Sequence, residues 1–174
     1  MRDVTEGATV WLTGLPSSGK TTLAYALEKK FIEAGQRVEV LDGDVIRESL
    51  TADLGLSAED RRTNVMRIGF VAELLSRNGV VAICPVIAPY REARAAVRER
   101  HEGRFIEVHV ATPVELCSER DVKGLYAKQR DGIITGLTGV DDPYEAPEHP
   151  EIRIDTSAMT LDESVEVLWQ ALHP

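Results

Sequence analysis

The stretch Gly14–Thr21, "GLPSSGKT", places two glycines, a lysine and a threonine at the spacing G-x-x-x-x-G-K-[ST]. This spacing is the phosphate-binding P-loop pattern, in which glycines let backbone N–H groups approach an anion closely. The apolar run Val10–Leu12 before it predicts a buried strand. After it, apolar residues recur every four positions from Leu23 to Phe31, which predicts a helix that ends at Gly35. The stretch therefore lies between a strand and a helix, where the pattern requires it.

The two residues that end the motif indicate what the loop holds. Lys20 is expected to reach the β and γ phosphates of a nucleoside triphosphate, and the Thr21 hydroxyl a magnesium ion. The positive end of the helix dipole adds to the attraction for an anion. The alternative is an ordinary glycine-rich turn, which would not need the lysine and the threonine at these places. We therefore predict a nucleoside triphosphate site here.

The composition indicates a single domain, residues 1–174, in the cytoplasm. A net charge of −9 argues against nucleic acid or an anionic membrane as a partner. The one basic concentration, residues 90–104, also carries acids and predicts a solvated helix face. Cys84 and Cys117 show no C-x-x-C spacing, which predicts two buried thiols in a reducing compartment. The first residues lack the apolar stretch of a signal peptide, and no run approaches the roughly 18 apolar residues of a membrane span.

Strand-like and helical patterns alternate along the chain. Strands are predicted at residues 10–12, 37–41, 80–84, 105–110 and 151–155, and helices at 22–35, 65–79, 92–101, 112–120 and 160–172. The last two helices open with capping boxes, Thr112 with Glu115 and Thr160 with Glu163. This alternation predicts an α/β fold with a parallel sheet covered by helices on both faces. Ligands are then expected at the carboxyl ends of the strands.

Two polar stretches interrupt the alternation, at residues 53–64 and 120–150. The second is longer than an ordinary connection, and long loops in compact domains are usually functional lids or disordered. It contains apolar residues able to pack, namely Leu125, Tyr126, Ile133, Ile134 and Leu137. This content favours a lid, which we place at about residues 120–148.

Two acidic residues, Asp42 and Asp44, end the stretch that follows the second predicted strand. On an extended segment, side chains two residues apart point the same way, so both carboxylates would face a γ phosphate and its metal ion. One would hold magnesium, and the other would orient the attacking hydroxyl and accept its proton. The alternative is a turn that uses Asp-Gly only for its geometry. Beside a P-loop we favour the catalytic interpretation.

Six motifs stand in the order and at the separations found in adenylylsulfate (APS) kinases: "GLPSSGKTT", "LDGDVIR", "GLSAEDRRTNVMRIG", "VIAPYREAR", "RDVKGLY" and "GLTGVDDPYEAP". The chain resembles this family from Val10 to about Pro147, and the last two motifs are far more specific than a P-loop. The resemblance implies a P-loop NTPase-type fold, with a parallel five-stranded sheet, helices on both faces and a lid. It also implies the family's reaction in sulfate activation, in which ATP phosphorylates the 3′-hydroxyl of APS to give PAPS, with Mg2+ as cofactor.

The resemblance also implies roles for individual residues. The ATP site would be the whole P-loop: Gly14, Leu15, Pro16, Ser17, Ser18, Gly19, Lys20, Thr21 and Thr22. Lys20, Asp42 and Asp44 would be catalytic, with Thr21 and Asp42 directed to the metal ion. The acceptor site would comprise Asp44, Arg47, Leu56, Arg61, Asn64, Ile87, Ala88, Lys123 and Leu137.

Within this acceptor site, Arg47, Arg61 and Asn64 would hold the phosphosulfate end of APS. Arginine suits this role because its planar fork of donors matches phosphate oxygens. The alternative for the arginines is surface salt bridging, for Arg61 within "EDRR". Lys123 matches the lysine of the family's "KGLY" lid motif.

Three residues depart from the family pattern. Many members have "ISPY" where this chain has "IAPY", so Ala88 supplies no hydroxyl and no site for a phosphoserine. Many also have two phenylalanines that sandwich the APS adenine, and here Leu56 and Leu137 stand at the matching positions. Leucines can cover a base by apolar contact but lack the stacking contribution.

Other functions compete with this interpretation. A P-loop kinase for another small hydroxylated acceptor would use the same donor site. A nucleotide-binding regulatory module is a further alternative, although no N-K-x-D stretch for guanine recognition is present. If APS is the acceptor, a separate ATP sulfurylase must supply it, because no sulfurylase-like segment fits in 174 residues. Kinases that resemble this chain are often homodimers, but the sequence does not fix the oligomeric state.

Overall fold

The sheet is the frame of the molecule. The computed structural model describes residues 4–173, and its five strands are parallel in the order β2-β3-β1-β4-β5. Their bounds are β1 Ala8–Thr13, β2 Val38–Val40, β3 Val81–Pro85, β4 Phe105–Val110 and β5 Ile152–Ile154. Because all five run in the same direction, their carboxyl ends meet at one edge of the sheet.

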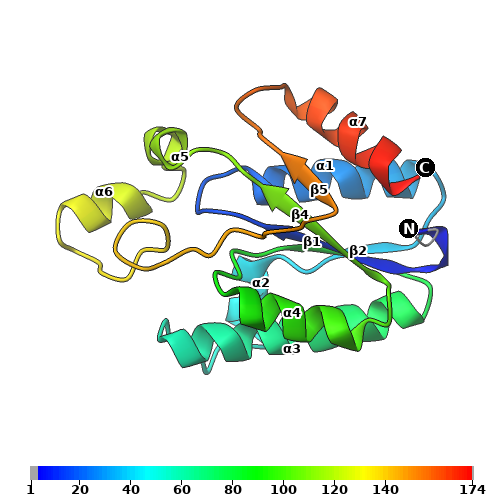
Figure 1. The fold of residues 1–174 in the computed structure, drawn as a ribbon, viewed down its shortest axis with the longest axis horizontal. Coiled ribbons are helices and arrows are strands. Elements are labelled where there is room, and N and C mark those ends of the chain that lie inside the picture. The colour runs from blue at the N-terminus through cyan, green and yellow to red at the C-terminus, as the bar shows by residue number, and fades with distance from the viewer. Residues whose placement is uncertain (1–3, 174) are drawn as a thin grey trace.

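Helices cover both faces of this sheet (Figure 1). In chain order the helical elements are η1 Val4–Glu6, α1 Lys20–Glu33, α2 Gly43–Glu48, α3 Ala58–Arg77, α4 Arg91–Arg100, α5 Val114–Arg120, α6 Leu125–Arg130 and α7 Leu161–Leu172. Figure 1 shows α1 and α7 on one face and α3 and α4 on the other. The predicted α/β fold with a five-stranded parallel sheet is therefore confirmed. No helix among residues 4–173 is both long enough and apolar enough to cross a membrane.

Strand β1 shows why the chain forms these layers. All six of its residues are buried, and successive side chains point to opposite faces. Val10 and Leu12 pack in the cluster that includes α1 and α7, whereas Trp11 packs in the cluster that includes α3 and α4. A strand buried on both faces reads as a continuous apolar run, as the sequence from Val10 to Leu12 does.

Only one of the two predicted capping boxes is present. Thr160 caps α7, and its hydroxyl and the Glu163 carboxylate make the reciprocal bonds of a capping box. The prediction for Thr112 was wrong, because α5 begins at Val114 without a side-chain cap. The Thr112 hydroxyl instead donates to the Ser18 carbonyl oxygen at 3.1 Å. A contact far along the chain thus takes the place of the local cap.

Residues 120–148, which we call the lid segment, lie at the carboxyl edge of the sheet. Figure 1 shows α6 and the loops around it projecting from this edge, opposite the two labelled termini. The segment contains the six-residue helix α6, and Tyr126 of that helix is buried in a cluster with Cys117 and Leu137. Leu125, Tyr126 and Leu137 therefore pack as the sequence predicts, whereas Ile133 is 68% exposed.

Candidate active site

A cavity of about 720 Å³ opens at the carboxyl edge of the sheet. Its lining comes from the P-loop, α2, α3, the turn after β3, the lid segment and the turn before α7. The predicted site residues that line it are Pro16, Ser17, Ser18, Gly19, Lys20, Thr21, Thr22, Asp42, Asp44, Arg47, Leu56, Arg61, Asn64, Ile87, Ala88, Lys123 and Leu137. The fold thus brings together motifs that are more than a hundred residues apart in the sequence.

Gly14 and Leu15 do not line this cavity. A Cβ on Gly14 would lie 2.5 Å from the Val110 carbonyl oxygen, so a side chain does not fit there. Leu15 instead packs against the cluster that contains Tyr126 and Leu137. Gly14 thus packs closely against β4, and Leu15 joins the loop to the lid segment.

Two threonine hydroxyls hold the centre of the P-loop. Thr112, after β4, and Thr156, after β5, both donate to the Ser18 carbonyl oxygen, at 3.1 and 2.8 Å. Gly19 follows with a φ of 96°, in the left-handed region that favours glycine. It is the N-cap of α1, so the loop leads directly into the first turn of this helix. The loop therefore presents its backbone to the cavity from a braced position.

Lys20 is folded against the P-loop that it belongs to. Its Nζ atom donates to the carbonyl oxygens of Gly14 and Leu15, at 2.9 and 2.6 Å, and to the Ser18 hydroxyl at 3.2 Å. Burial lowers the pKa of Lys20 to about 7, because a buried ammonium loses its hydration. Near neutral pH the charged and neutral forms are therefore close to balance, and a bound anion would favour the charged form.

The two aspartates do not lie on an extended segment, and that prediction was wrong. Asp42 is the N-cap of α2, 5% exposed, and its Oδ1 accepts the Asp44 backbone N–H at 2.8 Å. Asp44 belongs to the first turn of α2, and its side chain is 65% exposed and ion-paired with Lys123. Both still line the cavity. The pair therefore consists of a buried carboxylate held by a backbone N–H and an exposed one, rather than two equivalent groups.

Arg61 joins α3 to the lid segment. Its guanidinium donates to the carbonyl oxygens of Leu56 and Gly136, at 2.9 and 2.6 Å, and to the Thr138 hydroxyl at 2.6 Å. An ion pair with Asp142 at 2.8 Å completes the set. Three of these four partners lie in the lid segment, so surface salt bridging within "EDRR" does not describe this side chain.

Arg47 and Asn64 have weaker ties to the protein. Arg47 donates at 3.2 Å to the Gly55 carbonyl oxygen and more distantly to that of Leu54. The Asn64 Oδ1 atom is buried and accepts no hydrogen bond from the described residues. A buried acceptor without a donor is costly, so this atom in the cavity lining is suited to a donor on a ligand or on water.

The two leucines at the phenylalanine positions differ in their surroundings. Leu56 is 65% exposed, whereas Leu137 is 7% exposed and packs with Cys117 and Tyr126. Arg61 holds the Leu56 carbonyl and the carbonyl just before Leu137, which places the two leucine-bearing segments around one guanidinium. The cavity thus has one fixed and one accessible apolar residue at these positions.

The part of the lining formed by the turn after β5 and the start of α7 was not predicted from the sequence. These residues are Thr156, Met159, Leu161 and Ser164. These residues could have been expected in the site because they follow the carboxyl end of a predicted strand, where ligands bind in parallel sheets. Arg120 ties this part to the lid segment, since its guanidinium donates to the Thr156 hydroxyl at 2.9 Å.

The donor set fits a magnesium ion that is shared with phosphates. Among residues 4–173, no group of three or more His, Cys, Asp or Glu side chains is arranged to hold a metal ion. Mg2+ in phosphoryl-transfer sites usually takes one or two protein ligands and completes its shell with phosphates and water. The Thr21 hydroxyl and the Asp42 carboxylate, which both line the cavity, suit that arrangement.

Comparison with known proteins agrees with this geometry. The profile of a family described as "Adenylylsulphate kinase" matches residues 6–155. The adenylyl-sulfate kinase of Rippkaea orientalis is 56% identical over 96% of this chain and 92% of its own length. A probable adenylyl-sulfate kinase of Synechocystis is 55% identical over 95% of this chain and 93% of its own length.

A solved structure is similar over almost the same extent. It is the APS kinase of Mycobacterium tuberculosis in complex with AMPPNP and APS, which is 42% identical to this chain. The two superpose with a TM-score of 0.93, over 97% of this chain and 99% of the other. The fold is thus shared along almost the whole length of both.

Proposed function

The chain belongs to the adenylylsulphate kinase family, and we propose that it transfers the γ-phosphoryl group of ATP to the 3′-hydroxyl of APS, giving PAPS and ADP. One observation carries the proposal: a single cavity is lined by the P-loop, by both aspartates and by the candidate acceptor residues. Phosphoryl transfer needs a donor and an acceptor positioned in line, with charge stabilisation between them. This cavity offers groups for each task.

At the donor end, the P-loop backbone and Lys20 would bind the ATP phosphates. The N–H groups at the start of α1 supply donors and the positive end of the helix dipole. Lys20 now donates to P-loop carbonyl oxygens, and bound phosphates would take their place. Its charge would then stabilise the negative charge that develops on the transferred group.

A magnesium ion would be held by Thr21 and Asp42 together with the ATP phosphates. When bound, it would neutralise charge on the β and γ phosphates. Asp42 is suited to a fixed position because it is buried and accepts the Asp44 N–H. The chain's own contribution here is therefore a carboxylate whose geometry is set before the nucleotide arrives.

At the acceptor end, Asp44 is our candidate for the base that orients the 3′-hydroxyl and accepts its proton. It lines the cavity and is exposed enough to exchange its ion pair with Lys123 for a substrate contact. Arg47, Arg61 and Asn64 would hold the phosphosulfate end of APS. The loose hold of the protein on Arg47 supports this role, and Asn64 would contribute through its Nδ2 donors, because the phosphosulfate oxygens only accept.

The proposal treats residues 1–174 as one kinase domain, with the lid segment closing over both substrates. Leu56 and Leu137 would cover the APS adenine by apolar contact, beside Ile87 and Ala88. We also propose that a separate ATP sulfurylase supplies APS in the same cytoplasm.

The test is a coupled assay of ADP release. The purified protein would be given ATP and Mg2+ with APS, with other small alcohols such as shikimate or gluconate, or with no acceptor. We expect release that depends on APS, with PAPS formed in equal amount. Equal release with and without APS, or faster release with another alcohol, would overturn the proposal.

A further inference from the structure

The buried arginine Arg94 is unexplained by the site described so far. It lies in α4, in the basic stretch that the sequence analysis interpreted as a solvated face, yet it is 2% exposed. An arginine is almost never fully buried unless its charge is paired and its donors are used. Its partners therefore indicate its purpose.

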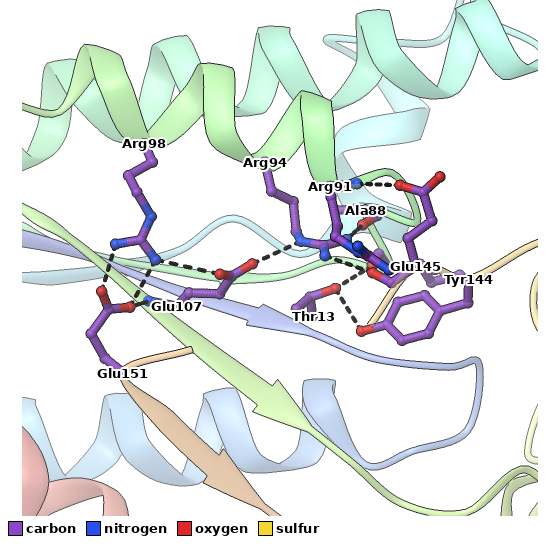
Figure 2. Close-up of polar contacts among 10 residues, drawn as sticks. Thr13, Ala88, Arg91, Arg94, Arg98, Glu107, Tyr144, Glu145 and Glu151 are labelled. Carbon is purple, nitrogen blue, oxygen red and sulfur yellow. Dashed lines mark hydrogen bonds and ion pairs between the residues drawn. The ribbon is translucent and has the colours of Figure 1, made fainter. Parts of the chain in front are cut away.

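Arg94 makes three short hydrogen bonds to three separate parts of the chain (Figure 2). Its Nε donates to Glu107 Oε1 on β4 at 2.7 Å, its Nη1 to the Ala88 carbonyl oxygen at 2.6 Å, and its Nη2 to the Glu145 carbonyl oxygen at 2.6 Å. One planar group thus links the sheet, the turn after β3 and the end of the lid segment. The fixed fork of a guanidinium sets the relative positions of all three.

The turn after β3 is the part that faces the cavity, and it is strained. Ala88 is buried with a φ of 43°, in the left-handed region that a residue with a Cβ rarely adopts. Such a conformation persists only where surrounding contacts hold it. Arg94 holds the carbonyl of Ala88 itself, and the Thr13 hydroxyl holds the preceding carbonyl, that of Ile87, at 2.6 Å.

The end of the lid segment is bound to the same turn. The Glu145 N–H donates to the Pro89 carbonyl oxygen at 2.8 Å, and the Tyr144 hydroxyl lies 3.1 Å from that of Thr13. Since the one hydroxyl hydrogen of Thr13 is directed to Ile87, Tyr144 is the donor in this pair. The contacts in Figure 2 therefore fasten the cavity wall and the lid's anchor to each other.

We propose that Arg94 is a positioning residue for the acceptor: it holds the wall Ile87–Ala88 and the lid anchor Tyr144–Glu145 in one fixed relation to β4. The proposal rests on the proposed function, since it takes this wall as the acceptor side of the cavity. The P-loop is braced by different contacts, from Thr112 and Thr156. Loss of Arg94 should therefore weaken acceptor binding and leave the ATP site intact.

Arg98 provides a matched control on the same helix. It also pairs with Glu107, at 3.3 Å, but its other partner is Glu151, and it touches neither the cavity wall nor the lid anchor. When either arginine is removed, Glu107 still forms an ion pair with the other arginine. Neither variant therefore leaves the Glu107 carboxylate without a cationic partner. Arg94→Met and Arg98→Met thus differ in their contact with the wall.

The experiment compares KM values in coupled ADP release and backbone amide exchange without substrates. Arg94→Met should raise the KM for APS about tenfold or more, with the KM for ATP within about twofold, because small misplacements of binding groups are costly. The KM for APS of Arg94→Lys should lie between those of Arg94→Met and the wild type. Arg98→Met should leave both KM values within about twofold. In amide exchange, Ile87, Ala88 and residues 144–146 should exchange faster in Arg94→Met than in Arg98→Met.

If Arg94→Met does not fold, Thr13→Val and Tyr144→Phe remove single hydroxyls that link the wall to the lid anchor, and each should raise the KM for APS about threefold. An unchanged KM for APS in the folded variants, or an equal rise in Arg98→Met, would overturn the proposal. A wild type that does not use APS would instead refute the proposed function. The exchange measurement then still decides whether Arg94 holds the wall, because it needs no substrate.

Discussion

Binding of ATP should draw a proton onto Lys20. Burial lowers the pKa of this side chain to about 7 in the free protein. Phosphates placed beside the ammonium would favour its charged form and raise the pKa again. Above pH 7, the lysine must therefore take up a proton when the nucleotide binds. ATP binding should then depend on pH in this range.

The size of the effect follows from the distance between the pH and this pKa. At pH 8.5 only about 3% of the free protein carries the charged lysine, so about one proton is taken up per ATP bound. The dissociation constant should rise roughly eightfold between pH 7.5 and 8.5, as the charged fraction falls. The ordinary lysine pKa of 10.5 would give almost no change over this range.

Titration calorimetry at pH 8.5, in two buffers that differ in their protonation enthalpy, measures the uptake directly. The Lys20→Met variant is the control, because it has no group to protonate at this position. Uptake below about 0.3 proton by the wild type, or equal uptake by the variant, would show that Lys20 is already charged in the free protein.

The same burial has a consequence for stability. The unfolded chain keeps this lysine charged up to about its ordinary pKa of 10.5, whereas the folded protein releases the proton near pH 7. Between these values the unfolded state binds more protons, so this group makes the free energy of unfolding rise with pH. Below about pH 7 the lysine is charged in both states, so the whole cost of burying the charge is subtracted from the free energy of unfolding.

Three substitutions test other parts of the site. Asp44→Asn keeps the shape but removes the proton acceptor, so kcat in coupled ADP release should fall about 100-fold or more with little change in the KM for ATP; near-normal turnover would exclude Asp44 as the base. Leu137→Phe adds a ring worth about 0.5–1.5 kcal/mol, so the KM for APS should fall about three- to tenfold, and an unchanged value would contradict the adenine contact. Gly139→Ala would place a Cβ 2.4 Å from Leu15 Cδ2 at a φ of 88°, so the melting temperature should fall and the KM for ATP rise. Gly132→Ala, at a φ of 69° with no described atom within 4 Å of the Cβ, should show the smaller loss, and equal losses would contradict the role of this contact.

The sequence predicted the sheet and the P-loop because both depend on local patterns. Continuous apolar runs marked buried strands, and the glycine spacing marked the loop between the first strand and its helix. The candidate acceptor residues came from the resemblance to the adenylylsulfate kinase family, and the structure brings them into one cavity with the P-loop.

The errors arose where distant contacts decide the geometry. Asp42 caps a helix too short to show a periodic pattern, so the "DGD" stretch looked extended. Thr112 looked like a helix cap, but its hydroxyl donates a hydrogen bond to the Ser18 carbonyl oxygen. Arg94 looked solvated because its partners, Glu107 and the carbonyls of Ala88 and Glu145, are remote in the sequence. No local pattern carries that information.

The position of β1 in the middle of the sheet bears on how the chain is made. β1 leaves the ribosome long before one of its two neighbours, β4, which begins only at Phe105. Until then, β1 has an open edge of unpaired N–H and C=O groups flanked by buried apolar side chains. Nascent chains that do not yet contain β4 should therefore rely on chaperones. A fragment that ends before Phe105 should aggregate when released.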